Sequence, residues 1–551
     1  MEAYRKEAEI PSQECVYTSS NGAQQPHPYY AQRAGSGGGL LLQDYHLIDL
    51  LAHFDRERVP ERVVHAKGAG AHGEFECTNG LEDLCIAGIF KKGAKCSVSC
   101  RMSTVGGESG TSDNLRDPRG FSIKFRTDEG NWDLVGNNTP IFFIRDPAKF
   151  PHFIHTQKRN PQTHKHHTDD ATLYWDYLSQ NPECIHQIVY MFGDRGIPYG
   201  ARFMNSYFGH TVKLINDKQE WVYAQFHMLS DQGEKNQTDP DQAAKESDDL
   251  MQNDLFESIE KGDYPTWTLK VQIMTKEQAR EAWKKKGINV FDLTHIWPHK
   301  DYPLREIGKM TLNKNVDNYF AEVEQISFSP AHMVPGIEPS EDPVLQSRLF
   351  SYDDTARHRI GANFMQLPVN QPTPKYKHGN FQRDGPMAYF NQGARSNYLS
   401  SIDPIQCRPR AVNLDKAHGD FVAEAISWLS ILRKEDFNQP GALWRDVFND
   451  EQKSRYVDNV VGHWSTIKDK SIISRMISIF RAVDPDLGAR LEKASGVQGG
   501  PDISQITFNG SHNGMAEPVK GANSMEYAKE FGLYQSGSVT DNPPAILPEP
   551  A

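Results

Sequence analysis

Short apolar stretches of strand length alternate with polar turns through the middle of the chain, over residues 60–370. Gly, Pro, Asn and Asp separate one stretch from the next, as in an antiparallel sheet or barrel. Charged helical inserts, such as residues 276–287, interrupt the series. The pattern predicts strands at residues 96–105, 120–127, 139–146, 210–216, 221–228 and 266–274.

The pattern becomes helical near residue 418. Apolar residues recur at steps of three and four over residues 421–434, 442–465 and 471–495, which predicts helices. Residues 371–417 are rich in Pro, Asn and Arg and predict a long wrapping connection. We therefore expect an α+β chain with five parts: an N-terminal arm (1–50), a β-barrel domain (51–370), a wrapping connection (371–417), a C-terminal helical domain (418–496) and a flexible tail (497–551).

Composition and charge narrow the possible partners and addresses. The net charge of -12 argues against nucleic-acid binding, which needs a basic face. No apolar run approaches the ~20 residues that span a membrane, and the N-terminus lacks the apolar core of a signal peptide. The chain ends in Pro-Glu-Pro-Ala rather than the peroxisomal Ser-Lys-Leu signal. We expect no nucleic-acid or membrane partner, no secretion, and a cytoplasmic or, by a non-standard route, peroxisomal protein.

Three segments carry candidate chemistry. The first holds Val63-Val64-His65, the second runs from Arg101-Met-Ser-Thr to Gly136-Asn-Asn-Thr-Pro-Ile-Phe-Phe, and the third is Arg348-Leu-Phe-Ser-Tyr-Asp-Asp-Thr-Ala-Arg-His-Arg359. Taken alone, His65 is more often a core histidine, Tyr352 a core tyrosine and Arg348 a surface cation. Together, in order and spacing, the segments resemble the haem catalase family, and the resemblance extends over roughly residues 15–495.

The resemblance implies a haem b centre with residues on both faces. Tyr352 would be the axial ligand of the iron, with Arg348 one helical turn earlier, and Asp342 and His210 would form a relay to that arginine. On the other face His65 would move the proton of peroxide, Ser103 would orient the His65 ring, and Asn137 would donate a hydrogen bond to developing charge.

Further residues are carried over from the same family pattern. The residues expected to contact haem are Arg62, Arg101 and Arg359, which would pair with its propionates, together with Val64, Phe142 and Phe150. The channel to the iron would be lined by Val105, Asp117, Phe143 and Phe153. NADPH is a possible second cofactor, at His186, Arg195, Asn205, Tyr207, Trp297 and His299. Tyr190, Gly193 and Leu229 depart from the family pattern at that site.

The predicted function is dismutation of hydrogen peroxide to water and dioxygen through a ferryl intermediate, by a homotetramer of the small-subunit type. Two alternatives stay open. One is a catalase-like haem oxidoreductase acting on an organic substrate, such as the NADPH-supported oxidative cyclisation of chanoclavine synthase in fungal ergot-alkaloid biosynthesis. The other is a non-catalytic haem scaffold. Met102, Asp353, Ala356 and the run His332-Met-Val depart from the family pattern in the segments around the haem.

Overall fold

The computed structural model describes residues 16–166, 169–243, 245–375, 379–389, 392–407, 410–418, 432–503 and 506. The chain divides into two compact units, Met1–Glu61 and Arg62–Ala551. Composition placed the end of the arm at residue 50, but helix α2 (Tyr45–Phe54) runs across that position and the division follows it. Asp44 caps this helix by accepting a hydrogen bond from the backbone N–H of Leu47.

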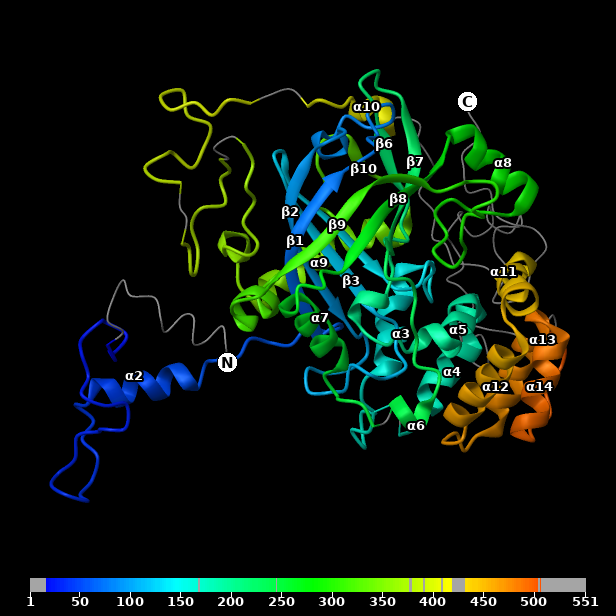
Figure 1. The fold of residues 1–551 in the computed structure, drawn as a ribbon, viewed down its shortest axis with the longest axis horizontal. Helices are drawn as coiled ribbons and strands as arrows, with labels where there is room; N and C mark the ends of the chain where they lie inside the picture. The colour runs from blue at the N-terminus through cyan, green and yellow to red at the C-terminus, as the bar shows by residue number, and fades with distance from the viewer. Residues whose placement is uncertain are drawn as a thin grey trace, which may run out of the picture. The chain divides into compact units, whose positions relative to one another are not determined.

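The second unit is built around a closed antiparallel barrel, which confirms the predicted fold (Figure 1). Among the described strands, the order β7-β5-β4-β3-β2-β1-β9-β8 returns to β7, while β6 and β10 extend from β7 outside the ring. Closure leaves the ring itself without an open edge. The strands are β1 (Gly68–Cys77), β2 (Lys95–Ser103), β3 (Gly120–Thr127), β4 (Gly130–Asn137), β5 (Ser206–Tyr207), β6 (Val212–Ile215), β7 (Trp221–Ser230), β8 (Thr266–Met274), β9 (Arg305–Asn315) and β10 (Ile337–Pro339).

Five of the six predicted strands are confirmed, and the sixth is wrong. Residues 139–146 form no strand, because this apolar run bends between Pro140 and Pro147 and sends its phenylalanines into a core outside the barrel. A short apolar run cannot be told from an irregular buried segment by periodicity alone. Inside the barrel, inward-facing aromatic side chains pack closely, as where Phe125 stacks on Trp132 with ring centroids 4.6 Å apart.

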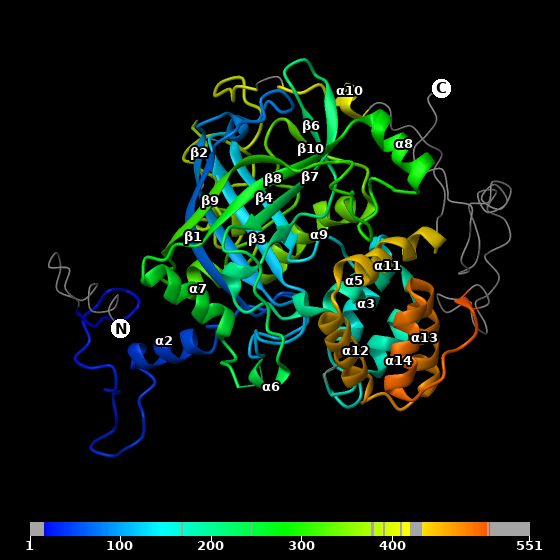
Figure 2. The same cartoon turned by 45° about the vertical axis from the view of Figure 1, so that its right-hand side comes forward.

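The helices of this unit gather mainly beside the barrel. Both cartoon views show α11–α14 next to α5 (Figure 2), and one buried apolar cluster joins this group to α4. Their bounds are α3 (Phe150–Gln157), α4 (Thr172–Gln180), α5 (Ile185–Phe192), α6 (Pro240–Ala243), α7 (Leu250–Glu260), α8 (Lys276–Lys286), α9 (Pro343–Arg359), α10 (Leu414–His418), α11 (Asn438–Ala442), α12 (Asp450–Trp464), α13 (Lys470–Val483) and α14 (Pro485–Ser495). The helices predicted at 442–465 and 471–495 are confirmed, and Pro485 begins α14. Most of the helix predicted at 421–434 lies outside the described residues.

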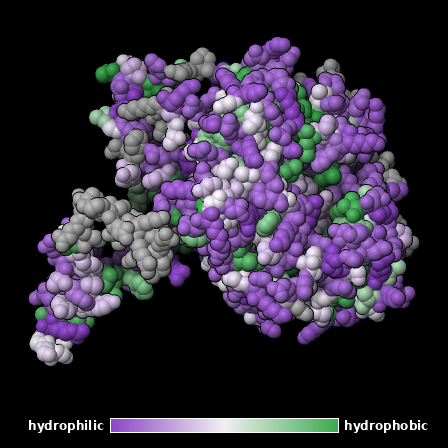
Figure 3. All heavy atoms as spheres, viewed as in Figure 1, coloured by the Kyte–Doolittle hydropathy of each residue, from purple (hydrophilic) through white to green (hydrophobic). Residues whose placement is uncertain are grey.

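The connection over residues 371–417 has little regular structure in its described part, where α10 is its one helix. Met387 and Ile402 there are 89% and 92% exposed. Elsewhere the surface drawn in Figure 3 is mostly hydrophilic. None of the helices in the described ranges has the length and apolar character of a membrane span. The tail predicted at 497–551 is described only at its start, and the borders of the last three parts stay predictions.

Candidate functional site

Strand register lines up the candidate residues at one end of the barrel. Ser103 on β2 pairs with Gly68 on β1, Gly120 on β3 pairs with Ser103, and Asn137 on β4 pairs with Gly120. These four residues therefore form one row across neighbouring strands, and His65 lies just before the first of them. The antiparallel pairing thus brings together three predicted residues, His65, Ser103 and Asn137, that are far apart in the sequence.

His65 is held by its backbone and by its ring. Its N–H donates to the carbonyl of Val105 (3.2 Å), and its φ of 66° lies in the left-handed region, where a residue with a side chain is strained by about 1–3 kcal/mol. The ring Nδ1 lies 2.9 Å from the Ser103 hydroxyl oxygen. This contact fixes the plane of the ring and leaves Nε2 as the nitrogen that can exchange a proton with a substrate.

Gly120 provides the space in which the ring lies. A Cβ atom at this position would lie 2.5 Å from Nδ1 of His65 and 2.7 Å from the hydroxyl oxygen of Ser103. Both distances are well inside van der Waals contact. The first residue of β3 must therefore lack a side chain for the His65–Ser103 pair to keep its place.

The surroundings of His65 keep its imidazole neutral. Although the residue as a whole is only partly buried, desolvation of the ring lowers its pKa to about 3, and the positive charges of Arg101 and Arg348 act in the same direction. A neutral imidazole at ordinary pH can accept a proton at once, which a general base must do.

Helix α9 carries Tyr352, the candidate ligand of the iron. Asp342 caps it by accepting from the N–H groups of Val344 (2.9 Å) and Leu345 (3.1 Å). One turn before Tyr352, a terminal guanidinium nitrogen of Arg348 donates to the phenol oxygen (2.6 Å), with the guanidinium carbon 4.8 Å from the ring centroid. A hydrogen-bond donor with a positive charge on the phenol oxygen is the arrangement that a phenolate ligand of iron needs.

The predicted relay is only partly assembled as expected. Nδ1 of His210 lies 2.6 Å from Oδ2 of Asp342, and both residues are buried. Among the described contacts, Arg348 makes no hydrogen bond to either residue and instead donates to the carbonyl of Val135 (3.2 Å). Its positive charge still lowers the pKa of His210, after the larger effect of burial, so the three groups lie within electrostatic range.

Three arginines converge as the resemblance implies. Arg62 and Arg359 both donate to the Glu324 carboxylate (3.4 and 2.6 Å), whereas Arg101 donates to the carbonyls of His65 and Ala66. Burial, then repulsion from Arg101 and Arg359, lowers the pKa of Arg62 well below its usual value. Nε of Arg101 is buried without a hydrogen-bond partner among the described atoms. Three guanidinium groups around one carboxylate fit a group that brings two further carboxylates, and the residues therefore suit a haem with its two propionates.

The predicted aromatic residues separate into two environments. Phe143 and Phe153 are buried, with ring centroids 4.3 Å apart, and belong to the helical core. Phe142 and Phe150, like Val64, pack against that core but remain partly exposed. The second pair therefore keeps a face available for a flat apolar ligand, as the haem-contact prediction requires.

The other two predicted channel residues, Val105 and Asp117, lie together. The Asp117 carboxylate accepts hydrogen bonds from the backbone N–H groups of Val105 (2.6 Å) and Gly106 (2.8 Å). Burial raises the pKa of Asp117 above its usual value. Because Val105 also holds the backbone of His65, Asp117 is linked to the His65 segment by a single residue.

A carboxylate of the chain itself, that of Glu234, occupies part of the predicted NADPH site. Glu234 forms an ion pair with Arg195 (2.9 Å) and accepts a hydrogen bond from the Asn205 amide (2.6 Å), which also donates to the Tyr207 hydroxyl (3.0 Å). The Arg195 guanidinium lies 5.4 Å from the Tyr190 ring centroid. A ligand phosphate at Arg195 would have to displace or repel this carboxylate.

The other predicted NADPH residues are mostly buried. Nδ1 of His186 lies 2.9 Å from the Thr294 carbonyl oxygen, and Trp297 is buried. His299 is the more accessible member, and its ring centroid lies 6.1 Å from that of His227. The structure therefore places these residues in one neighbourhood but offers a nucleotide few open polar groups.

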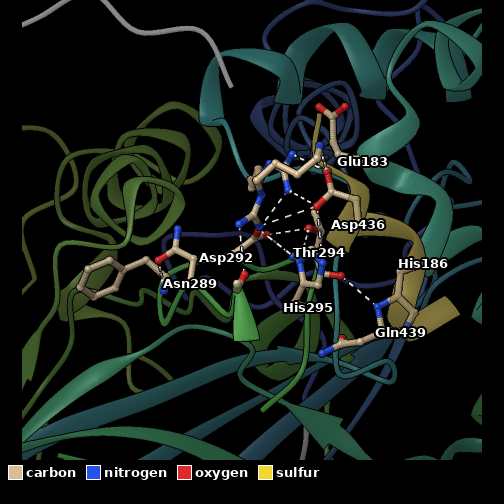
Figure 4. A network of polar contacts seen from close by, with 12 residues as sticks. Glu183, His186, Asn289, Asp292, Thr294, His295, Asp436 and Gln439 are labelled. Carbon is tan, nitrogen blue, oxygen red and sulfur yellow. Dashed lines mark hydrogen bonds and ion pairs between the residues drawn. The ribbon is translucent and has the colours of Figure 1, made fainter. Parts of the chain in front are cut away.

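A buried network of ion pairs lies next to His186 (Figure 4). It connects Arg145 and Asp292 with Asp436, which lies shortly before α11. Arg145 contacts Asp436 (2.8 Å) and Asp292 (3.0 Å), and His295 lies 3.1 Å from Asp292. Asp292, His295 and Asp436 lie close enough together to hold a metal ion. Arg145 and Arg433 instead supply the compensating positive charge, and they hold the pKa values of both carboxyls below their usual range against the opposing effect of burial.

Sequence reasoning missed three residues that shape these sites. Gly120 could have been noticed as a glycine that opens a predicted strand, where a close approach to another group is a common reason. Glu324 and Glu234 gave no signal, because an acidic residue in a polar stretch is usually solvated. The departure at Met102 has a simple explanation, since its side chain lies buried in the barrel core and is not among the residues that face His65.

The chain resembles known proteins over most of its length. The model of the catalase family matches residues 18–404, and that of catalase-related immune-responsive proteins matches residues 430–495. A catalase of Schizosaccharomyces pombe is 51% identical, with 87% of this chain and 93% of the relative covered. A peroxisomal catalase of Candida tropicalis is 50% identical, with 87% and 98% covered.

Solved structures give the same result. The crystal structure of a fungal catalase has a TM-score of 0.83 at 46% identity, covering 87% of this chain and 95% of that one. Catalase A from Saccharomyces cerevisiae has a TM-score of 0.83 at 44% identity, covering 87% and 99%. The fold is that of a haem-dependent oxidoreductase. The chain belongs to the catalase family, and it is an enzyme that acts on hydrogen peroxide.

Proposed function

We propose that this chain dismutates hydrogen peroxide at a haem b bound between His65, Ser103 and Asn137 on one side and the α9 residue Tyr352 on the other. The observation that carries the proposal is that Arg348, which donates to the Tyr352 oxygen (2.6 Å), also lies within electrostatic range of the neutral, hydroxyl-oriented imidazole of His65. A carrier needs no such acid–base pair. None of the relatives named above is an alkaloid-pathway enzyme, and no contact described here favours that alternative.

Each protein group then has a separate task. Arg62, Arg101 and Arg359 hold the propionates, and Tyr352 supplies the axial oxygen. When bound, haem supplies an iron centre that takes two electrons from one peroxide after giving two to another. The sum is two hydrogen peroxide molecules converted to two waters and one dioxygen.

His65, Ser103 and Asn137 handle the proton and the developing charge. His65 accepts a proton from one peroxide oxygen at Nε2 and returns it to the other, which leaves as water. Ser103 keeps Nδ1 in place, so that Nε2 faces the substrate throughout. The Asn137 amide donates a hydrogen bond to the oxygen on which negative charge develops, without adding a charge of its own.

Oxygen evolution from peroxide by the haem-loaded protein tests this proposal. His65→Ala should lose roughly 10³-fold or more in rate while keeping its haem absorbance, because proton transfer and haem binding use different residues. Oxygen evolution near the wild-type rate in this variant would contradict the role given to His65. Product from an ergot-alkaloid precursor with NADPH, combined with negligible oxygen evolution, would instead support the organic-substrate alternative.

We also infer that NADPH binds weakly at the Arg195 region. Arg195 is the candidate phosphate partner, but Glu234 already neutralises it at 2.9 Å, and Leu229 offers no second cation. Calorimetry should show affinity that falls in Arg195→Ala and rises in Glu234→Gln. Tight binding unchanged by either substitution would place the nucleotide elsewhere.

We propose a homotetramer as the working assembly. Each compact unit carries exposed apolar side chains that a single chain leaves in water, and such surfaces usually mark contacts with another protein. In the first unit these include Tyr29 (87% exposed) and Leu42 (85%), and in the second Met387 and Ile402. Sedimentation should give four times the chain mass, whereas a monomer at micromolar concentration would contradict the assembly.

We propose a peroxisomal or cytoplasmic location. The support is that relatives from Candida tropicalis and Candida albicans are named peroxisomal catalases. A fluorescent fusion carrying the tag at the N-terminus, compared with one tagged at the C-terminus, should show whether the protein enters peroxisomes. Secretion of either fusion would contradict the proposal.

A further inference from the structure

Two residues that depart from the family pattern lie together in the structure. Nε2 of His332, in the segment before β10, is 3.8 Å from Oδ1 of Asp353 on α9. Nδ1 of the same ring lies 2.8 Å from Oδ2 of Asp133 on β4. His332 therefore bridges two carboxylates, one on the barrel wall and one directly after Tyr352 in the sequence.

The barrel end of this bridge is firmly fixed. Asp133 and Lys124 are fully buried, and the Lys124 ammonium lies 2.8 Å from both oxygens of the carboxylate. The backbone N–H of Ser329 donates to the same carboxylate (3.0 Å), and the Asp133 N–H donates to the His332 carbonyl (3.0 Å). Burial opposes ionisation of Asp133, but Lys124 and His332 hold its pKa below the usual value. The His332 ring is therefore anchored to β3 and β4 through both its backbone and its side chain.

The helix end of the bridge lies beside the candidate ligand. Asp353 directly follows Tyr352 on α9. Arg348 lies one turn before Tyr352 and donates to the carbonyl of Val135 on β4 (3.2 Å). Strand β4 thus holds α9 before Tyr352 through Val135 and after it through Asp133 and His332.

The contact between His332 and Asp353 is too weak to matter for stability but can affect the orientation of α9. The His332 and Asp353 side chains remain 18% and 24% exposed, and their atoms are 3.8 Å apart, so the pair adds little to the free energy of folding. A contact this weak does little for the stability of a large unit. It can still select one orientation of a helical turn, because an equilibrium between two orientations responds to the same small energy.

We propose that His332 is a positioning residue for the axial ligand: by bridging Asp133 to Asp353 it sets the orientation in which Tyr352 presents its phenol oxygen to iron. This inference rests on the proposed role of Tyr352. It also explains why both departures occur in one chain, since neither residue alone would complete the bridge.

The first test removes only the contact between His332 and Asp353. Asp353→Asn leaves the Asp133–His332 contact intact and removes one charge, while Asp354→Asn is the matched control, an exposed neighbour on the same helix. The electron paramagnetic resonance spectrum of the ferric holoenzyme reports the iron–phenolate geometry, and transfer of haem to excess apomyoglobin reports how tightly haem is held. Asp353→Asn should change the rhombic splitting and speed haem loss by about two- to fivefold. Asp354→Asn should match the wild type in both measurements.

A double-mutant cycle separates the bridge from a direct effect of the Asp353 charge on Tyr352. His332→Gln should cause a similar spectral change, and Asp353→Asn should add almost nothing in that background. An unchanged spectrum in Asp353→Asn, an equal change in Asp354→Asn, or additive effects in the double variant would each overturn the proposal. Tyr352→Phe tests the ligand itself. If that variant loses haem while Asp353→Asn matches the wild type, the bridge fails and the ligand assignment stands; if it keeps the wild-type spectrum, the ligand assignment fails.

Discussion

Replacing Gly120 with alanine should inactivate the enzyme without removing its haem. The new Cβ would lie 2.5 Å from Nδ1 of His65. Ordinary contact between such atoms is roughly 3.5 Å, so the imidazole would have to move by about 1 Å or turn away from Ser103. Backbone on β3 cannot move in its place, because Gly120 is paired on both sides, with Ser103 and with Asn137.

A displacement of about 1 Å in a catalytic group can cost on the order of 10²-fold in rate, which is about 2.7 kcal/mol in the barrier. Oxygen evolution from peroxide should therefore fall about a hundredfold in Gly120→Ala. Haem absorbance should stay normal, because the substitution touches none of the arginines that we propose bind haem. Overpacking adds roughly 1–3 kcal/mol of destabilisation, which thermal unfolding will show separately.

Gly462→Ala is the matched control, because a Cβ at that position in α12 meets open space. It should keep full activity. The double variant Gly120→Ala with Ser103→Ala also lacks the Ser103 hydroxyl, which leaves room beside the new methyl group. It tests whether crowding around His65 causes the loss of activity. Activity of Gly120→Ala within twofold of the wild type, with normal haem content, would refute the packing account of His65.

Further predictions follow from the two faces of the site. Tyr352→Phe should fail to retain haem in gel filtration, and full haem content with an unaltered spectrum would contradict the ligand assignment. Asn137→Ala should lose about 10²-fold in oxygen evolution, as for one lost hydrogen bond to developing charge, and less than His65→Ala. Because the pKa of His65 is lowered to about 3, its proton-accepting form should persist as pH falls, and the acid limb of the rate should lie near or below about pH 4. An acid limb near the ordinary histidine value of about 6.5 would show that His65 is more solvated than the structure indicates. In thermal unfolding, added NADPH should raise the Tm of Glu234→Gln more than that of the wild type.

Four of the eight ring strands, β2, β3, β7 and β8, could be predicted from the sequence, because alternation and turn residues are local signals. Residues 120–127 and 266–274 coincide with β3 and β8. The stretch at 139–146 failed because burial against α3 and α4 makes an irregular segment as apolar as a strand. The barrel's closure by β7–β8 pairing is a non-local contact that no local pattern encodes.

The site could be predicted in its residues but not in its contacts. His65, Asn137 and Tyr352 came from the family resemblance. Strand register places Ser103 and Asn137 in one row, and one helical turn places Arg348 beside Tyr352. The Glu234 carboxylate on Arg195 could not be foreseen, because a loop determines it and a loop conformation leaves little trace in sequence. In the same way, the sequence could not connect His332 with Asp353, because their contact exists only in the folded chain.

The row of Gly68, Ser103, Gly120 and Asn137 also ties activity to the folding of the sheet. Side chains on a strand alternate between faces, so a slip of one residue between β2 and β3 would turn Ser103 or its neighbours away from His65 and bury polar groups in the barrel. Helices could form and the chain could collapse without assembling the row. During refolding, the return of peroxide activity should therefore follow the slow non-local pairing of strands rather than the earlier gain of helix signal. The enzyme's own reaction thus provides a measure of when the strands of its barrel have found their native partners.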